Sequence, residues 1–170
     1  PLQNPIVQAK AWSTLDWLSG GRAEALFGVG WLKEEFDILG VPFAKRGRMA
    51  DEYLAAMIQL WTKDEPEFEG EFVNFKNVGF APKPVQKGGV PIWLGGDAEA
   101  VMKRVAKFGK GWSPFRTPPE SFPDCIDFIN HWNHIWFGDC DSTKRRKTPS
   151  CLFIFRTRWL NGCGYHDAEC

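Results

Sequence analysis

Residues 91–98 read Pro-Ile-Trp-Leu-Gly-Gly-Asp-Ala, and this stretch decides the fold. The apolar run Ile92–Leu94 shows no alternation, which predicts a short strand covered on both faces, as in a parallel sheet. A glycine pair then turns the chain into a segment with amphipathic-helix spacing, at Ala98, Val101, Met102 and Val105. A strand, a glycine turn and a helix in this order predict an α/β fold with parallel strands.

The turn at Gly95 and Gly96 is also a candidate phosphate site. Glycines let ligand atoms approach the backbone. The first amides of a helix have no partner within it, and the helix dipole adds partial positive charge, so the turn can bind an anion. A tight structural turn is the alternative. As the N-cap, Asp97 would satisfy one amide itself, and its charge would repel phosphate unless the side chain points away.

A second strand is predicted upstream, over residues 25–30, again as an apolar run without alternation. Gly28 and Gly30 would leave open space at the end of this strand. Trp31 could then form a flat wall for a planar ring, and a tryptophan buried between helix and sheet is the alternative. The same two alternatives apply to Trp112, in a third predicted strand over residues 112–115.

Helices are predicted between these strands. Asn4-Pro5 is typical of a helix start, and Ser19-Gly20-Gly21 of a helix end. Between them, apolar residues follow helical spacing at Val7, Ala11, Leu15 and Leu18. A short helix is predicted near residues 33–36. A longer helix carries a stripe that we expect to pack on the core: Ala50, Tyr53, Leu54, Met57, Ile58 and Trp61. Residues 68–75 alternate around a glycine, which predicts a small hairpin or excursion.

Composition and length set limits on the function. The chain has 170 residues, with 21 basic and 21 acidic side chains that balance to a net charge of +0. This balance argues against a chain built mainly to bind nucleic acid. No apolar run approaches the roughly 18 residues that a membrane helix needs. Because the chain starts with Pro1 in what resembles the middle of a domain, we expect a piece of a longer protein.

The residues after about 120 follow a different pattern. All five cysteines lie here, at Cys125, Cys140, Cys151, Cys163 and Cys170. An odd number without a CxxC pair disfavours a disulfide framework, so we expect free thiols in a reducing, cytoplasmic compartment. Cys163 and His166 have a spacing that some zinc sites use, but no second close pair accompanies them. Lys144–Lys147 is a basic run.

Several separate motifs together resemble the bacterial luciferase-like monooxygenase family. They are LSGGR at 18–22, GVGW at 28–31 with EF and LGVPF following, APKPVQ at 81–86 and PIWLGG at 91–96. The resemblance covers about residues 1–117, in order and with typical gaps. It implies a partial TIM (β/α)8 barrel with an excursion, incomplete at both ends, since a complete barrel takes about 250 residues. We therefore divide the chain into a barrel fragment, 1–117, and a divergent tail, 118–170, whose poor order is one expectation.

The resemblance also implies a cofactor and a site. Members use reduced FMN or a deazaflavin to oxidise or reduce small organic substrates. By the resemblance, the backbone of Gly95, Gly96, Asp97 and Ala98 holds the flavin phosphate, and Gly30 and Trp31 face the ring or the substrate. It assigns no catalytic residue, because the family's often catalytic histidine precedes residue 1. A homo-oligomer is one expectation, and no metal, nucleic acid or membrane partner is expected.

The competing hypothesis is a non-catalytic remnant scaffold. Residues 1–117 would then serve only as support, and the Lys144–Lys147 run with Cys163 and His166 would bind nucleic acid or zinc. A basic run this short is usually a solvated surface, so we favour the oxidoreductase.

Overall fold

The computed structural model describes residues 1–137 and the backbone of residues 153–154. Helices and strands alternate along this part of the chain, as predicted. The α-helices are α1 (Pro5–Ser19), α2 (Lys33–Ile38), α3 (Arg46–Thr62), α4 (Glu99–Phe108) and α5 (Phe122–Phe137). The strands are β1 (Ala25–Phe27), β2 (Phe68–Glu69), β3 (Asn74–Phe75), β4 (Ile92–Gly95), β5 (Gly111–Ser113) and β6 (Phe153–Ile154). Short 3-10 turns precede α3 (Phe43–Lys45) and α5 (Pro119–Ser121).

The central sheet has the order β1-β4-β5-β6, and each neighbouring pair is parallel. Leu26 lies opposite Trp93, and Trp93 lies opposite Gly111. The three predicted strands are therefore present, although β1 ends at Phe27 instead of residue 30, and β6 was not predicted. Parallel strands joined through helices make up part of a (β/α)8 barrel, which confirms the predicted fold class.

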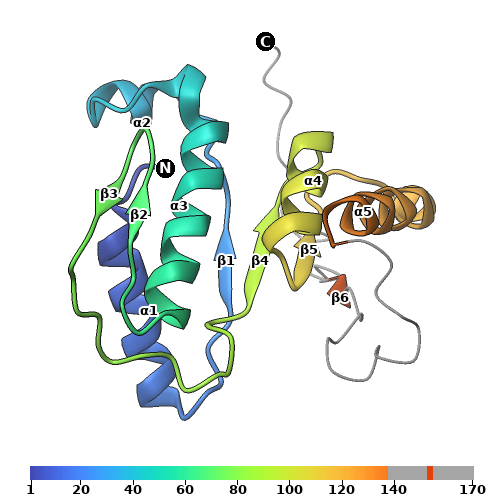
Figure 1. Cartoon of the computed structure of the whole chain (residues 1–170). Helices are drawn as coiled ribbons and strands as arrows, with labels where there is room; N and C mark the ends of the chain where they lie inside the picture. Colours follow the sequence, from blue (N-terminus) through green and yellow to red (C-terminus); the bar gives the residue numbers. More distant parts are fainter. Residues whose placement is uncertain (138–152, 155–170) are drawn as a thin grey trace.

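Helices cover one face of this sheet (Figure 1). Ala25 of β1 is fully buried against them, whereas Leu26, which points to the other face, is 58% exposed. Ile92 and Leu94 of β4 belong to the same buried cluster as Leu54 and Leu60 of α3 and Val105 of α4. The core thus lies between the sheet and the helices α1, α3 and α4.

Helix α1 begins and ends as predicted but buries a different face. The Asn4 side chain accepts hydrogen bonds from the amides of Ile6 and Val7, and Gly20 has a left-handed φ of 66°. The buried residues are Pro5, Ala9, Ser13 and Asp16, whereas all four residues at the predicted apolar spacing lie partly or fully in solvent, Leu18 at 78% exposure.

Polar contacts with other segments explain which face of α1 is buried. The indole N–H of Trp61 in α3 donates to the carbonyl of Ala9 at 3.0 Å. Asp16 accepts from the backbone amide and the side-chain amide of Gln86 at 3.0 and 2.9 Å. The small residues Ala9 and Ser13 let α1 approach α3 closely, which outweighs the burial of larger side chains.

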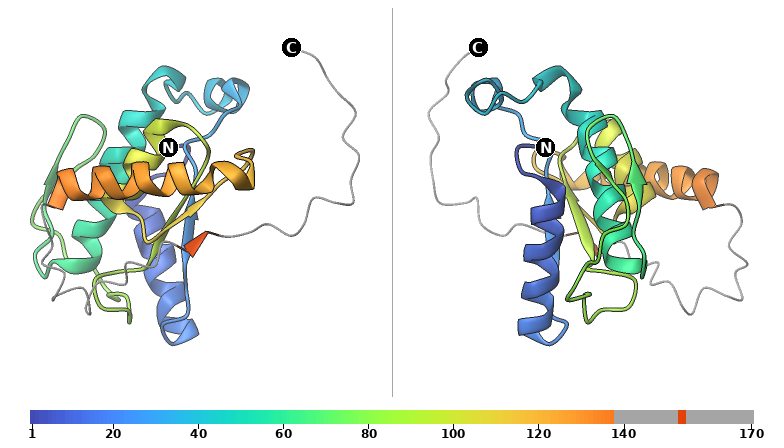
Figure 2. Two further views of the ribbon diagram at one scale, coloured as in Figure 1. Left: turned by 90° about the vertical axis from the view of Figure 1, so that its right-hand side faces the viewer. Right: turned by 60° about the vertical axis from the view of Figure 1, so that its left-hand side comes forward.

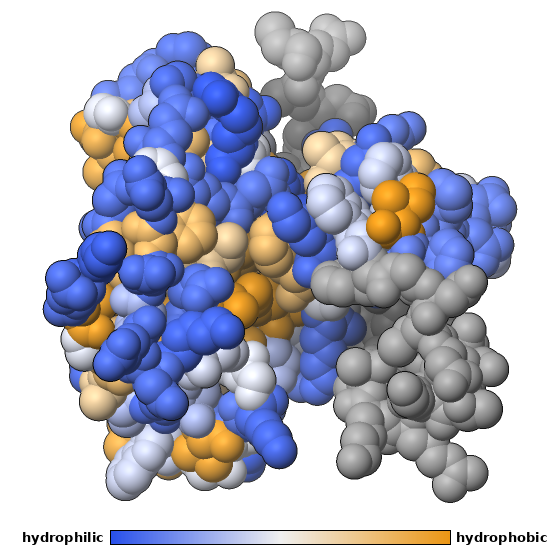
Figure 3. All heavy atoms as spheres, viewed as in Figure 1, coloured by the Kyte–Doolittle hydropathy of each residue, from blue (hydrophilic) through white to orange (hydrophobic). Residues whose placement is uncertain are grey.

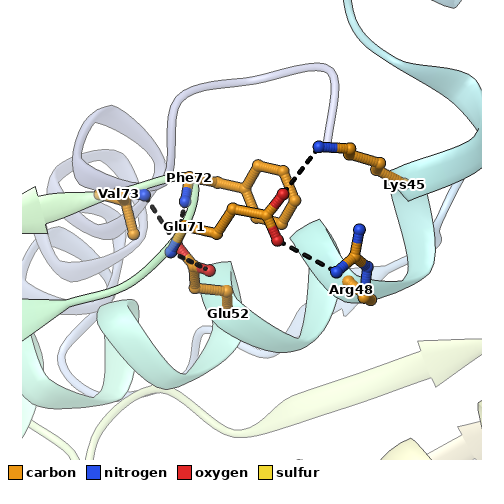
Figure 4. Close-up of polar contacts among 6 residues, drawn as sticks. All are labelled: Lys45, Arg48, Glu52, Glu71, Phe72 and Val73. Atoms are coloured by element: carbon orange, nitrogen blue, oxygen red, sulfur yellow. Dashed lines mark hydrogen bonds and ion pairs between the residues drawn. The ribbon is translucent and has the colours of Figure 1, made fainter.

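The predicted hairpin is the antiparallel pair β2–β3, with Phe68 opposite Phe75. Its tip, residues 70–73, lies at the same end of the molecule as α2 (Figure 1). The Glu52 carboxylate of α3 accepts hydrogen bonds from three consecutive tip amides, those of residues 71–73, at 2.6–2.9 Å. Glu71 pairs with Lys45 and Arg48 at 2.7 and 3.1 Å (Figure 4). Polar contacts therefore anchor the tip on α3.

Helix α5 lies across the direction of the strands and packs on α4 (Figure 2). Ile129 of α5 is 1% exposed, and the Lys103 ammonium of α4 lies 4.5 Å from the centre of the Trp132 ring. The proposed boundary at residue 117 stays a prediction. The basic run 144–147, His166 and all cysteines except Cys125 lie outside the described residues. Within the described part, no helix is both long and apolar enough to cross a membrane.

Candidate cofactor and substrate site

A cavity of about 480 Å³ opens where β1 and β4 end. Strand β1 and the loop after it contribute residues 26–31, and β4 contributes Leu94 and Gly95. Helix α3 contributes Ala50, Tyr53, Leu54 and Met57, and the chain before and within α1 contributes Pro1, Leu2, Gln3, Pro5, Gln8 and Trp12. The volume lies within the range of roughly 300–1,000 Å³ found for small-molecule sites.

The cavity wall is largely apolar. On the face drawn in Figure 3, charged and polar residues predominate, and apolar residues gather in a strip between the α3 side and the α4 side. Tyr53, Arg104 and the two glutamines supply the polar groups of the wall. Burial first, and the charge of Glu52 second, raise the pKa of Tyr53, so its hydroxyl stays a neutral donor and acceptor.

Arg104 is only 6% exposed and is held by Asp51 of α3. Its Nε lies 2.5 Å from Asp51 Oδ1, and its Nη2 donates to Asp51 Oδ2 at 3.2 Å and to the carbonyl of Gly47 at 3.1 Å. Neither Arg104 nor Tyr53 was predicted as a site residue. A signal for Arg104 was present, since it stands three residues after Val101 and just before Val105, on the apolar face of α4.

Gly30 and Trp31 lie together at the cavity. Gly30 has a φ of 82°, and a Cβ at this position would lie 2.7 Å from Cε2 of Phe36. Both glycines line the cavity, but a Cβ at Gly28 would meet no atom within 4 Å, whereas at Gly30 the Phe36 ring occupies the space that a Cβ would need. Trp31 is 82% exposed, so it is not buried between helix and sheet, whereas Trp112 is fully buried.

The glycine pair closes β4 and leads into α4. Gly96 has a φ of 128°, its amide donates to the carbonyl of Ser113 at 3.1 Å, and its carbonyl accepts from the Trp112 indole at 2.7 Å. Strand β5 and its tryptophan therefore hold Gly96 from both sides. Gly95 lines the cavity, while Gly96, Asp97 and Ala98 lie beyond its wall.

Four amides after this turn remain open. The first amide of α4 that bonds within the chain is that of Val101, which donates to the carbonyl of Ala98 at 2.8 Å. Within residues 1–137, the amides of residues 97–100 donate to no acceptor, and no side chain caps the helix. Such amides, with the helix dipole, can bind an anion.

Of the two possibilities for Asp97, the structure shows the one in which its side chain points away from the start of α4. Ala98 is the N-cap, and the Asp97 carboxylate instead accepts hydrogen bonds from the loop after β5. The donors are the amides of Phe115, Arg116 and Thr117 at 2.9–3.0 Å and the Thr117 hydroxyl at 2.5 Å. Burial tends to raise the pKa of Asp97, but these bonds outweigh it and lower the pKa below its ordinary value. The charge thus turns toward four donors, which leaves the α4 amides open.

No catalytic residue emerges near the cavity. Burial, followed by the charges of Asp124 and Asp97, raises the pKa of Cys125, so its thiol stays protonated and is a poor nucleophile. Residues 1–137 and 153–154 contain no cluster of three histidine, cysteine or acidic side chains that could hold a metal ion.

Similar proteins share these segments. The uncharacterized protein Rv0953c of Mycobacterium tuberculosis is 42% identical over 110 residues, which are 64% of this chain and 39% of that protein. The FMNH(2)-dependent dimethylsulfone monooxygenase of Pseudomonas putida is 34% identical over 107 residues, which are 61% of this chain and 30% of that protein. The chain therefore spans less than half the length of these relatives.

Solved structures share the fold. Monooxygenase RslO1 from Streptomyces bottropensis superposes with a TM-score of 0.70 at 23% identity, over 79% of this chain and 42% of that one. An F420-dependent secondary alcohol dehydrogenase, solved with an F420-acetone adduct, superposes with a TM-score of 0.68 at 20% identity. The superposition covers 78% of this chain and 41% of that one.

The family model for luciferase-like monooxygenases matches residues 1–133. The match thus includes the loop that Asp97 holds and extends beyond residue 117 into α5. It takes in both glycine-containing strand ends, the hairpin and the open start of α4. The chain belongs to the luciferase-like monooxygenase family.

Proposed function

We propose that this chain forms the cofactor-phosphate site and part of the substrate cavity of a luciferase-like oxidoreductase that uses reduced FMN or a deazaflavin. The observation that carries the proposal is the set of four open amides at residues 97–100, which follow a strand whose end lines an apolar cavity. FMN and F420 both carry phosphate, the anion that such amides bind. The two named cofactors of similar proteins, FMNH(2) and F420, support the same choice.

The described residues fit such a cofactor in two ways. Residues 97–100 would hold the phosphate through backbone N–H groups, without any cationic side chain. The apolar wall formed by β1, β4 and α3 would exclude water from the reacting atoms, and Trp31 would lie against a planar ring. When bound, the flavin or deazaflavin supplies the redox chemistry, and the protein supplies binding and orientation.

The substrate that this cavity favours is a small, mostly apolar organic molecule. Apart from the two tryptophans, Trp12 and Trp31, the described residues that bring polar side chains to the wall are Tyr53, Arg104, Gln3 and Gln8. The positive charge of Arg104 is already paired with Asp51, so the cavity offers no free charge from this residue to bind an ionic substrate.

The test is a titration of the purified chain with FMN, riboflavin and F420, followed by fluorescence. We expect FMN to bind at least about tenfold more tightly than riboflavin, because only FMN carries the phosphate that the amides would bind. Comparison with F420 then decides between the two cofactor classes. Equal affinities for FMN and riboflavin would reject the phosphate site.

A further inference from the structure

We infer that the Asp97 side chain is a positioning residue for the cofactor phosphate: by bonding the loop after β5, it holds the amides of residues 97–100 open and in place. This inference rests on the proposed function and adds a role that the backbone alone does not give. An aspartate beside a phosphate site would otherwise be a defect, since like charges repel.

The Asp97 carboxylate points toward the loop after β5. All three amides of residues 115–117 and the Thr117 hydroxyl donate to it, at 2.5–3.0 Å. Because these four donors occupy the carboxylate, it does not accept hydrogen bonds from the first amides of α4, and no other side chain caps that helix. An aspartate in this region more often satisfies helix amides itself.

The Asp97 carboxylate joins two neighbouring loops. Asp97 follows the end of β4, and residues 115–117 follow the end of β5, so the side chain ties two neighbouring loops on the carboxyl edge of the sheet. The bonds of Gly96 to Ser113 and Trp112 fix the preceding peptide. The backbone that carries the open amides is therefore held from both sides of residue 97, which spares the cofactor the cost of ordering it.

A positioning role and a purely electrostatic role of Asp97 would change FMN affinity in opposite directions. If Asp97 acted only through its charge, replacing it would relieve repulsion and strengthen FMN binding. If it positions the amides, replacing it weakens FMN binding and leaves riboflavin, which has no phosphate, unchanged. The two roles thus have opposite signs for the same measurement.

A matched control exists elsewhere in the chain. The Glu52 carboxylate of α3 also accepts hydrogen bonds from three consecutive backbone amides, but these belong to the tip of the β2–β3 hairpin (Figure 4). Glu52→Gln should loosen a comparable carboxylate-to-loop contact without touching the β4–α4 turn. Comparing the Asp97 variants with Glu52→Gln therefore separates a general loss of stability from a specific loss of phosphate binding.

The experiment measures FMN and riboflavin affinity for the full chain and its variants, with thermal unfolding of each. For Asp97→Ala we expect about tenfold weaker FMN binding and riboflavin affinity changed by less than about twofold. Asp97→Asn, which keeps one acceptor oxygen, should fall between the wild type and Asp97→Ala. Thr117→Val removes one donor, should fold even if Asp97→Ala does not, and should weaken FMN binding more modestly. Glu52→Gln should leave the FMN-to-riboflavin ratio unchanged.

Two results would overturn the inference, and they are distinguishable. If the wild type prefers FMN and the Asp97 and Thr117 variants keep or strengthen that preference, the phosphate site stands and the positioning role falls. If the wild type itself shows no preference for FMN over riboflavin, the proposed function fails and the positioning role fails with it.

Discussion

At the scale of single residues, two glycines at one strand end have different roles. Gly30 adopts a φ of 82°, and the Phe36 ring occupies the space that a Cβ would need. Gly28 has no positive φ, and a Cβ there would meet nothing within 4 Å. The spacing of the two glycines in the sequence does not distinguish them, because the difference comes from Phe36 of α2.

Gly30→Ala should therefore destabilise the chain by about 2 kcal/mol, the sum of a left-handed backbone for alanine and a clash with Phe36. Gly28→Ala is the matched control and should change the free energy of unfolding by no more than about 0.5 kcal/mol. Urea unfolding of both variants measures the difference. Equal losses in the two variants would show that Phe36 does not constrain position 30.

A second prediction at this scale concerns pH. The folded-state pKa of Asp97 lies below its ordinary value of 3.8, because hydrogen bonds from residues 115–117 outweigh the effect of burial. Its contribution to stability is therefore complete above the unfolded-state pKa and is lost as pH falls through the lower folded-state pKa. As the pH falls from about 5 through the unfolded-state pKa and then through the folded-state pKa, the wild type should progressively lose its stability advantage over Asp97→Asn. A constant difference across that range, measured by urea unfolding, would contradict this.

At the scale of elements, α4 begins without a side-chain cap, and this absence has opposite consequences for stability and binding. Ala98→Ser would supply a hydroxyl oxygen that accepts a hydrogen bond from the backbone amide of Ala100. We expect it to stabilise the chain by about 1 kcal/mol and to weaken FMN binding, because one open amide becomes occupied. Unfolding and FMN titration of the same sample test both effects. A stabilised variant with unchanged FMN affinity would mean that Ala100 does not contact the phosphate.

The elements also show where sequence patterns succeed. Asn4, Gly20 and the glycine pair predicted helix ends and turns correctly, because capping and left-handed backbone depend on neighbouring residues. The apolar stripe of α3 was right for Ala50, Leu54, Met57 and Trp61, which are all buried. In α1 the apolar spacing indicated the wrong face, because Trp61 and Gln86 bond to the other one from outside the helix.

At the scale of the whole molecule, the Asp51–Arg104 pair joins α3 to α4 beside the cavity. Asp51→Asn would leave a buried guanidinium without its countercharge. We expect a loss of about 2 kcal/mol, less than for a fully buried pair because Asp51 is half exposed. The double variant Asp51→Asn/Arg104→Met should lose less than the sum of the single losses. Additive losses in a double-mutant cycle would show that the two side chains are not coupled.

The sequence alone determined the order of strands and helices as far as β5, the turn at Gly95 and Gly96, and the family, because these depend on local propensity and on motifs contiguous in the chain. Only the tertiary structure decided the direction of Asp97, the different constraints on Gly28 and Gly30, and the place of Arg104 in the cavity wall. In each case the deciding partner lies far along the chain or on another element: residues 115–117, Phe36 and Asp51. Side-chain direction depends on such partners, and residue spacing alone does not specify them.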